Sequence, residues 1–182
     1  MASIPSPDLQ YPIGKFSPPT HYAWENIQSW IQDIEQLPGQ LEGTVQSFDA
    51  YQLETPYRPG GWTVQQLLHH LPDSHMNAYI RFKLGFTEVN PHIKTYREDL
   101  WANLPDSSST PVNVSLTLLH ALHIRWKNLL KGMDPSDFEK TVFHPEKKRD
   151  IPLKEMLAMY SWHGKHHLAH ISGLKERMKW SN

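Results

Sequence analysis

The chain has 182 residues, of which 38% are hydrophobic and 20% are charged, and its formal net charge is −1. These values predict one globular domain spanning residues 1–182, and they argue against the basic surface of a nucleic-acid-binding protein. Cysteine is absent, which excludes disulfide bonds and thiolate ligands. The first residues lack the pattern of a signal peptide, and no apolar stretch approaches the roughly 18 residues of a membrane span. We therefore expect a cytoplasmic protein that does not contact a membrane.

Four long helices are predicted. Residues 1–20 are proline-rich and predict an extended N-terminal arm laid on a surface. Apolar residues at helical spacing then predict helices at about 21–49, 63–86, 113–131 and 153–178. A short helix near 97–103 and a turn or hairpin within 133–152 are expected between them. This pattern favours an all-α four-helix bundle with long loops.

Two of these helices carry features that matter for the site. Thr63 and Gln66 match a capping box at the start of the second helix, and Pro72 should bend that helix. In the third helix, the apolar stripe predicts a buried face made of Val114, Leu118, Ala121, Leu122, Trp126 and Leu129.

The last helix carries His163 and His167 within its apolar stripe. Their i, i+4 spacing stacks both imidazoles on one face, which is how a helix presents two ligands to one metal ion. Two core histidines satisfied by hydrogen bonds are an equally favoured interpretation, since each buried imidazole needs a polar partner. His166 projects to the rim of the stripe. His170 is borderline, and supporting a ligand, contacting substrate or being partly solvated are open roles for it.

A third ligand is expected from the second helix, which contains His69, His70 and His75. On an ideal helix His69 points away from the apolar stripe, so we expect it to be solvated. His70 lies at the edge of the stripe and His75 near its centre, but the bend expected at Pro72 makes this projection unreliable. Periodicity therefore leaves His70 and His75 as open alternatives.

Other polar residues give weaker signals. Asp73 follows His70 by three residues and could accept a hydrogen bond from a ligand imidazole, although a surface carboxylate is an equal alternative. Glu-x-x-His pairs of a di-iron bundle are absent, which favours one metal ion, and no other catalytic residue is identified. Five histidines lack ligand spacing and are expected to be surface or ordinary core residues: His21, His92, His120, His123 and His144.

The sequence resembles the DinB-like superfamily of four-helix bundles. The resemblance rests on GGWTVQQLLHHLPDSHMNAYIRFKL at 60–84 and WHGKHHLAH at 162–170, and it extends over nearly the whole chain through YPIGKF, TPYRPGGWT and ERMKW. It is strongest to the YfiT-type bacterial members, described as metal-dependent hydrolases and related to bacillithiol S-transferases. Gly164 and Lys165 depart from residues common in relatives, which alters the rim of the expected pocket and leaves the ligands intact.

This resemblance implies the ligand set. In the family the metal ligands are the second histidine of the HH pair and the first and last histidines of H-x-x-H-H, which are His70, His163 and His167 here. It is thus the resemblance that selects His70 over His75. It also implies an up-down-down-up bundle and a homodimer, and it places Asp73 at a position of the family motif.

Three neutral imidazoles leave coordination positions open, as in catalytic zinc sites. Such an ion can lower the pKa of bound water to about 7, and it can also bind a thiol as thiolate. We therefore expect a metal-dependent enzyme acting on a small molecule, either a hydrolase or an S-transferase that uses a low-molecular-weight thiol such as bacillithiol. A non-enzymatic metal-binding or stress-response protein is the alternative. Zinc is the first choice of divalent ion, with nickel or another transition metal as alternatives.

Overall fold

The structure, a computed structural model, describes residues 8–180, so the first residues of the expected arm lie outside the described part. Among the described residues, no helix combines the length and the apolar character that crossing a membrane requires. In chain order the elements are α1 (Trp24–Val45), α2 (Ala50–Glu54), α3 (Val64–Thr87), α4 (Glu98–Trp101), α5 (Asp106–Ser109), α6 (Val112–Lys131), the 3₁₀ helix η1 (Pro135–Glu139), β1 (Thr141–His144), β2 (Arg149–Pro152) and α7 (Leu153–Arg177).

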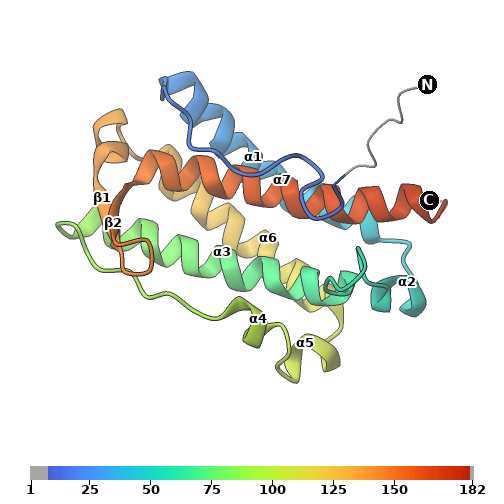
Figure 1. The fold of residues 1–182 in the computed structure, drawn as a ribbon. Coiled ribbons are helices and arrows are strands. Elements are labelled where there is room, and N and C mark those ends of the chain that lie inside the picture. The colour runs from blue at the N-terminus through green and yellow to red at the C-terminus, as the bar shows by residue number, and fades with distance from the viewer. Residues whose placement is uncertain (1–7, 181–182) are drawn as a thin grey trace.

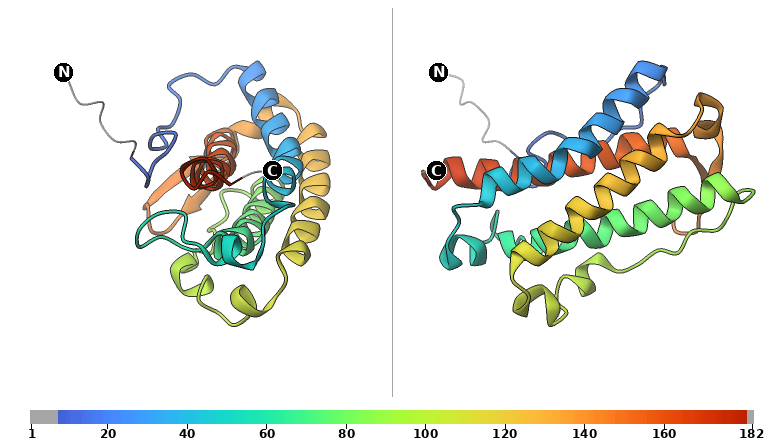
Figure 2. Two further views of the ribbon diagram at one scale, coloured as in Figure 1. Left: turned by 90° about the vertical axis from the view of Figure 1, so that its right-hand side faces the viewer. Right: turned by 180° about the vertical axis from the view of Figure 1, so that it is seen from behind.

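The four long helices α1, α3, α6 and α7 form a bundle (Figure 1). Helices α1 and α7 run in one direction while α3 and α6 run in the opposite one, which confirms the up-down-down-up order (Figure 2). Both α1 and α3 pack against α6, and both pack against α7. A long crossover, residues 88–111, carries the chain back along the bundle so that α6 can run parallel to α3.

Helix α3 begins and continues for local reasons that the sequence shows. The Thr63 hydroxyl accepts a hydrogen bond from the Gln66 N–H at 3.1 Å, and the Gln66 side chain accepts one from the Thr63 N–H at 3.0 Å. This reciprocal cap confirms the predicted start of the helix. The helix then runs unbroken through Pro72, because packing against α6 and α7 outweighs the missing donor. His70 and His75 therefore project from one continuous helix.

The shorter elements are confirmed in part. Strands β1 and β2 pair antiparallel, with Val142 opposite Ile151, so residues 133–152 contain the expected hairpin. Helix α2 lies between the first two predicted helices, where the sequence analysis expected no helix. Its start is fixed by Asp49, whose carboxylate accepts a hydrogen bond from the Gln52 N–H at 2.8 Å, and this cap was not identified from the sequence.

The buried face of α6 differs from the predicted one. Val114 and Leu118, expected in the core, are 51% and 44% exposed. The helix instead buries a face that contains Ser115 and His123 as well as Trp126. A search for apolar periodicity counts the first two as solvent-facing, because it cannot know that each has a polar partner inside the bundle.

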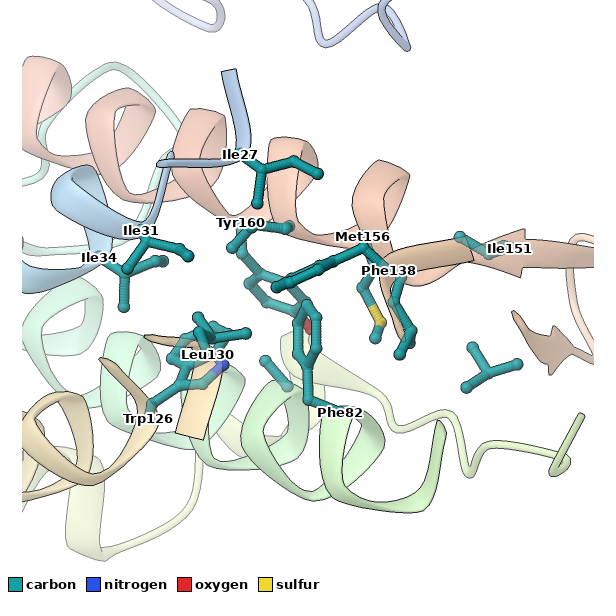
Figure 3. Packing of buried hydrophobic residues seen from close by; sticks show 14 of the residues in the cluster. Ile27, Ile31, Ile34, Phe82, Trp126, Leu130, Phe138, Ile151, Met156 and Tyr160 are labelled. Atoms are coloured by element: carbon teal, nitrogen blue, oxygen red, sulfur yellow. The ribbon is translucent and has the colours of Figure 1, made fainter. Parts of the chain in front are cut away.

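The apolar core falls into two clusters, separated along the bundle axis by polar residues. The first, part of which Figure 3 shows, includes Ile27, Ile31, Ile34, Ala78, Phe82, Trp126, Leu130, Met156 and Tyr160. The second includes Leu37, Leu41, Leu67, Leu71, Leu116, Leu119, Ile171 and Leu174. Between the two clusters α3, α6 and α7 each contribute a histidine, namely His75, His123 and His163. Because buried polar groups must be satisfied internally, this layer is where specific chemistry is expected.

The described part of the N-terminal arm, residues 8–23, consists of turns and irregular structure that lies along α7. The indole N–H of Trp162 donates a hydrogen bond to the Gly14 carbonyl at 3.2 Å, and the Phe16 ring packs 5.9 Å from the Trp162 ring. The arm therefore covers a face of α7 that would otherwise be exposed to solvent.

Candidate metal centre

Three histidine side chains from two helices meet between α3 and α7. The Nε2 atom of His163 lies 3.3 Å from Nε2 of His70 and 3.1 Å from Nε2 of His167. His163 and His167 occupy successive turns of α7, while α3 supplies His70. The three ligand atoms all lie within 4.8 Å of one another. The structure thus brings together the three residues that the family resemblance selected.

The nitrogen separations suit a metal ion. In a tetrahedral site with zinc–nitrogen bonds of about 2.0–2.1 Å, two ligand nitrogens lie about 3.3 Å apart. The separations of His163 Nε2 from the other two nitrogens, 3.3 and 3.1 Å, agree with that value. His70, His163 and His167 can therefore hold one divalent ion through three nitrogens.

Burial also lowers the pKa of all three imidazoles. It lowers the pKa of His70 to about 4. It lowers the pKa of His163 and of His167 well below the usual value, and the neighbouring histidines add to the effect. All three are consequently neutral at physiological pH, which is the form that binds a metal ion.

His75 lies behind the cluster. Its Nε2 atom is 3.1 Å from Nδ1 of His163, and its Nδ1 atom is 2.8 Å from Nε2 of His123. The Nδ1 atom of His123 is in turn 2.5 Å from the carbonyl oxygen of Ile34 on α1. We call this series, from His163 through His75 and His123 to Ile34, the histidine chain. His75 thus contacts the back of a ligand imidazole, and His123, expected to be an unremarkable residue, is part of the same network.

Asp73 and His69 behave differently from expectation. Burial raises the pKa of Asp73 to about 6, and the nearby Asp106 carboxylate adds to the rise. Within residues 8–180 no hydrogen bond joins the Asp73 carboxylate to His70, so its supporting role stays a prediction. His69 is only 6% exposed, and its Nδ1 atom lies 2.7 Å from the Ser115 hydroxyl. The expectation of a solvated His69 was wrong because α6 packs on that face of α3.

His166 and His170 are both buried on α7. The His166 ring stacks on Trp162 with ring centroids 4.5 Å apart, and the His170 ring stacks on Tyr57 at 4.1 Å. Together with His167 they form a second group of imidazoles whose ligand atoms approach within 4.8 Å. The sequence placed His166 at the rim of the stripe and left the role of His170 open, because it could not show the arm and the 55–63 loop that cover them.

A cavity of about 510 Å³ opens onto the imidazole cluster. Arg81, which the sequence search missed, also lines this cavity and is 9% exposed. Its guanidinium donates to the Tyr160 hydroxyl at 3.1 Å and to the Lys94 carbonyl at 2.8 Å, while its Nε–H is buried without a partner. A signal was present, since Arg81 lies 11 residues after His70 and therefore projects, like His70, at the edge of the apolar stripe. The remaining lining comes mainly from aromatic and polar residues of the two helices and two loops, among them Tyr57, Trp62, Ser74, Tyr96, Trp162 and His166.

Comparison with proteins of known sequence finds close relatives in Bacillus. A protein of Bacillus mycoides (strain KBAB4) is 53% identical over 173 residues, which cover 95% of this chain and 99% of that protein. A protein of Bacillus thuringiensis subsp. konkukian (strain 97-27) is 52% identical with the same coverage. Both bear the name "putative metal-dependent hydrolase".

A solved structure shares the fold. YfiT from Bacillus subtilis, described as a probable metal-dependent hydrolase with an unusual four-helix bundle topology, is 46% identical and superposes with a TM-score of 0.92. The match covers 95% of this chain and 99% of YfiT. The sequence pattern of the DinB superfamily matches residues 33–171 of this chain, which include all three histidines of the cluster. The chain therefore belongs to the DinB superfamily.

Proposed function

We propose that the protein is a metal-dependent hydrolase of small anionic molecules, with His70, His163 and His167 as the ligands of one zinc ion. One observation carries the proposal: three neutral imidazole nitrogens converge at a spacing suited to a metal, at the wall of a cavity of about 510 Å³. A cavity of this size takes a small molecule. The names of the Bacillus relatives point to the same class of reaction.

The metal ion and the protein residues have different roles in the proposed reaction. When bound, a zinc ion with an open coordination position lowers the pKa of water to about 7 and polarises a substrate oxygen. The histidines keep that ion dipositive, because neutral imidazoles add no negative charge. In the overall reaction water adds across the scissile bond, so that its hydroxyl group joins the electrophilic centre and its proton leaves with the other product.

Arg81 defines the proposed substrate class. A buried guanidinium is costly unless an anion accompanies it, and within residues 8–180 no carboxylate forms an ion pair with Arg81. Its partners are neutral oxygens of Tyr160 and Lys94, so no protein carboxylate balances its positive charge. We propose that a carboxylate or phosphate of the substrate binds where the guanidinium lines the cavity, accepts a hydrogen bond from its terminal N–H groups, and orients the scissile bond toward the metal.

The test uses two chromogenic esters, the mono-p-nitrophenyl ester of terephthalic acid and its methyl ester, in which the ring keeps the carboxylate too far from the p-nitrophenyl ester for intramolecular attack. A charge-assisted hydrogen bond contributes about 1.5–3 kcal/mol, so we expect kcat/KM to favour the acid by roughly 10- to 100-fold. Arg81→Gln should abolish that preference, and Arg81→Lys should retain part of it. An equal preference for the acid in wild type and Arg81→Gln contradicts the role of Arg81, and no preference for the acid in wild type contradicts the substrate class. Rates that do not exceed those of chelator-treated protein, with zinc, nickel, cobalt and manganese in turn, contradict the hydrolase.

A second candidate function is thiol transfer. The all-nitrogen ligand set favours it, since a dipositive ion without anionic ligands binds thiolate strongly. In this reaction a low-molecular-weight thiol loses its proton to solvent, and its sulfur displaces a leaving group from an electrophilic carbon. Incubation with bacillithiol and monobromobimane, followed by chromatography of the conjugate, measures this reaction. Conjugation above background without ester hydrolysis would favour the transferase. Absence of both activities with stoichiometric metal would favour a non-enzymatic metal-binding protein.

A further inference from the structure

The histidine chain has a direction that its last member fixes. The Ile34 carbonyl oxygen can only accept a hydrogen bond, so the Nδ1 atom of His123 must carry the proton of that contact. A neutral imidazole has one protonated nitrogen, and burial lowers the pKa of His123 to about 4, which keeps it neutral. The Nε2 atom of His123 is therefore an acceptor.

The same reasoning assigns the donor and acceptor nitrogens of His75 and His163. Because Nε2 of His123 accepts, Nδ1 of His75 donates across the 2.8 Å contact, which leaves Nε2 of His75 as an acceptor. Nδ1 of His163 then donates to His75 across 3.1 Å. The remaining nitrogen of His163, Nε2, has a lone pair and no proton, and it is the atom that faces His70 and His167.

We propose that His75 and His123 are positioning residues that hold His163 in the tautomer whose Nε2 can bind a metal ion. This inference rests on the metal site of the proposed function, and it is independent of the reaction catalysed there. A hydrogen bond to the distal nitrogen of a ligand imidazole fixes its tautomer and orientation and raises its basicity. Here that role belongs to two further histidines and a backbone carbonyl.

The surroundings suit a fixed scaffold. His75 is fully buried and His123 is 2% exposed, and their rings meet edge to edge, nearly parallel at 17°, with centroids 5.0 Å apart. The Trp126 ring meets the edges of both, at 5.6 Å each, and Tyr160 packs against His75 at 5.6 Å. These aromatic neighbours belong to a core cluster that joins all four long helices, so the imidazoles have little freedom to rotate.

The last member of the histidine chain, the Ile34 carbonyl, shows that the chain positions a ligand and does not transfer protons. A path for protons needs a group at its far end that can release them to solvent or take them up. This chain ends on a backbone amide carbonyl inside the core, which does neither at ordinary pH. The histidine chain therefore orients the ligand and does not carry protons away from the site.

The first test is the tautomer of His163 in metal-free protein, read from long-range ¹H–¹⁵N correlation spectra. We expect protonated Nδ1 and unprotonated Nε2 in the wild type. His123→Gln, whose amide can donate to Ile34 and accept from His75, should keep that tautomer. His123→Phe, which can do neither, should give a mixture. An Nε2-protonated His163 in wild-type protein overturns the inference, whatever the variants do.

The second test is Zn²⁺ affinity, measured by competition with a chelating dye. Loss of a partner behind a metal ligand weakens binding by roughly 10- to 100-fold, which we expect for His123→Phe, with recovery in His123→Gln. Ser115→Ala is the matched control, since it removes an α6-to-α3 histidine hydrogen bond of 2.7 Å that leads to no ligand nitrogen. Affinity in His123→Phe equal to that of the control overturns the inference. Zinc binding by wild-type protein without enzymatic activity would reject the proposed hydrolase and would leave this inference about the ligand tautomer unaffected.

Discussion

Stability of the metal-free protein should fall steeply in mild acid, and His123 provides a quantitative test. Burial lowers the pKa of His123 from 6.5 to about 4, with His120 adding a smaller effect of the same sign. Between these pH values the unfolded chain binds a proton at this imidazole and the folded chain does not. Its contribution to the free energy of unfolding is therefore complete above pH 6.5 and is lost as the pH falls toward 4.

The expected magnitude follows from the shift. A difference of this size between the folded and unfolded pKa corresponds to about 3 kcal/mol in total, of which about 2 kcal/mol is lost between pH 8 and pH 5. This loss is a large part of the roughly 5–15 kcal/mol that stabilises a typical domain. Other buried histidines change stability in the same direction, so the measurement must isolate His123.

The assay is urea unfolding of chelator-treated protein at pH 8 and pH 5, followed by circular dichroism. His123→Gln removes the titrating group, so its loss of stability between the two pH values should be smaller than the wild-type loss by about 2 kcal/mol. His21→Gln, which removes an exposed imidazole, is the control and should match the wild type. An equal loss in His123→Gln and wild type would refute the assignment of a buried, neutral His123.

Three further predictions concern packing, an ion pair and the metal. Gly85→Ala gains about 1 kcal/mol of helix propensity, but its Cβ would lie 2.7 Å from a methyl group of the fully buried Leu153, so we expect a net loss of about 1 kcal/mol in urea unfolding. Asp33 contacts Ser161 at 2.5 Å and Lys165 at 2.6 Å, two residues before and after His163 in the sequence. Asp33→Asn weakens both contacts and should lower the free energy of unfolding, measured in urea, by about 1–2 kcal/mol. Lys165→Met removes only the exposed ion pair and should lower it by less than about 1 kcal/mol. Zinc at 1,000 times its dissociation constant should stabilise the protein by about 4 kcal/mol and raise Tm by roughly 10 °C in calorimetry, and an unchanged Tm would show that zinc does not bind the folded state preferentially.

Much of the fold could be predicted because its signals are local. The four long helices follow from apolar periodicity and from the reciprocal cap of Thr63 and Gln66, and each observed boundary lies within about four residues of the expected one. The order of helix directions did not follow from periodicity, because nothing local in the 88–111 segment says that it returns along the bundle. The family resemblance supplied that order.

The site was predictable only where one helix decides it. The stacking of His163 and His167 follows from their spacing, but the choice between His70 and His75 depends on where α7 and α6 lie around α3. Both residues turned out to contact His163, one at Nε2 and the other at Nδ1. A one-dimensional pattern cannot make that distinction, because it is a difference between two atoms of the same imidazole.

The buried face of α6 was predicted wrongly because polar residues lie on it. His123 and Ser115 face inward because each meets a partner more than 40 residues away, the Ile34 carbonyl and the His69 ring. Periodicity treats such residues as solvent-facing and consequently turned the predicted face of the helix toward Val114 and Leu118. Arg81 was missed for the same reason, since its partners lie on α7 and the crossover.

Stoichiometric zinc binding to single-alanine variants tests the metal centre most directly. Metal per chain and affinity would be measured by equilibrium dialysis and mass spectrometry for wild type, His70→Ala, His167→Ala and His170→Ala. His170 belongs only to the second group of imidazoles, whereas His167 belongs to both. We expect one zinc ion per chain in wild type and in His170→Ala, and a loss of affinity greater than roughly 100-fold in the other two variants, beyond the effect of an outer hydrogen-bond partner. Full affinity in His70→Ala together with lost binding in His170→Ala would place the ion elsewhere on α7 and contradict the proposed centre.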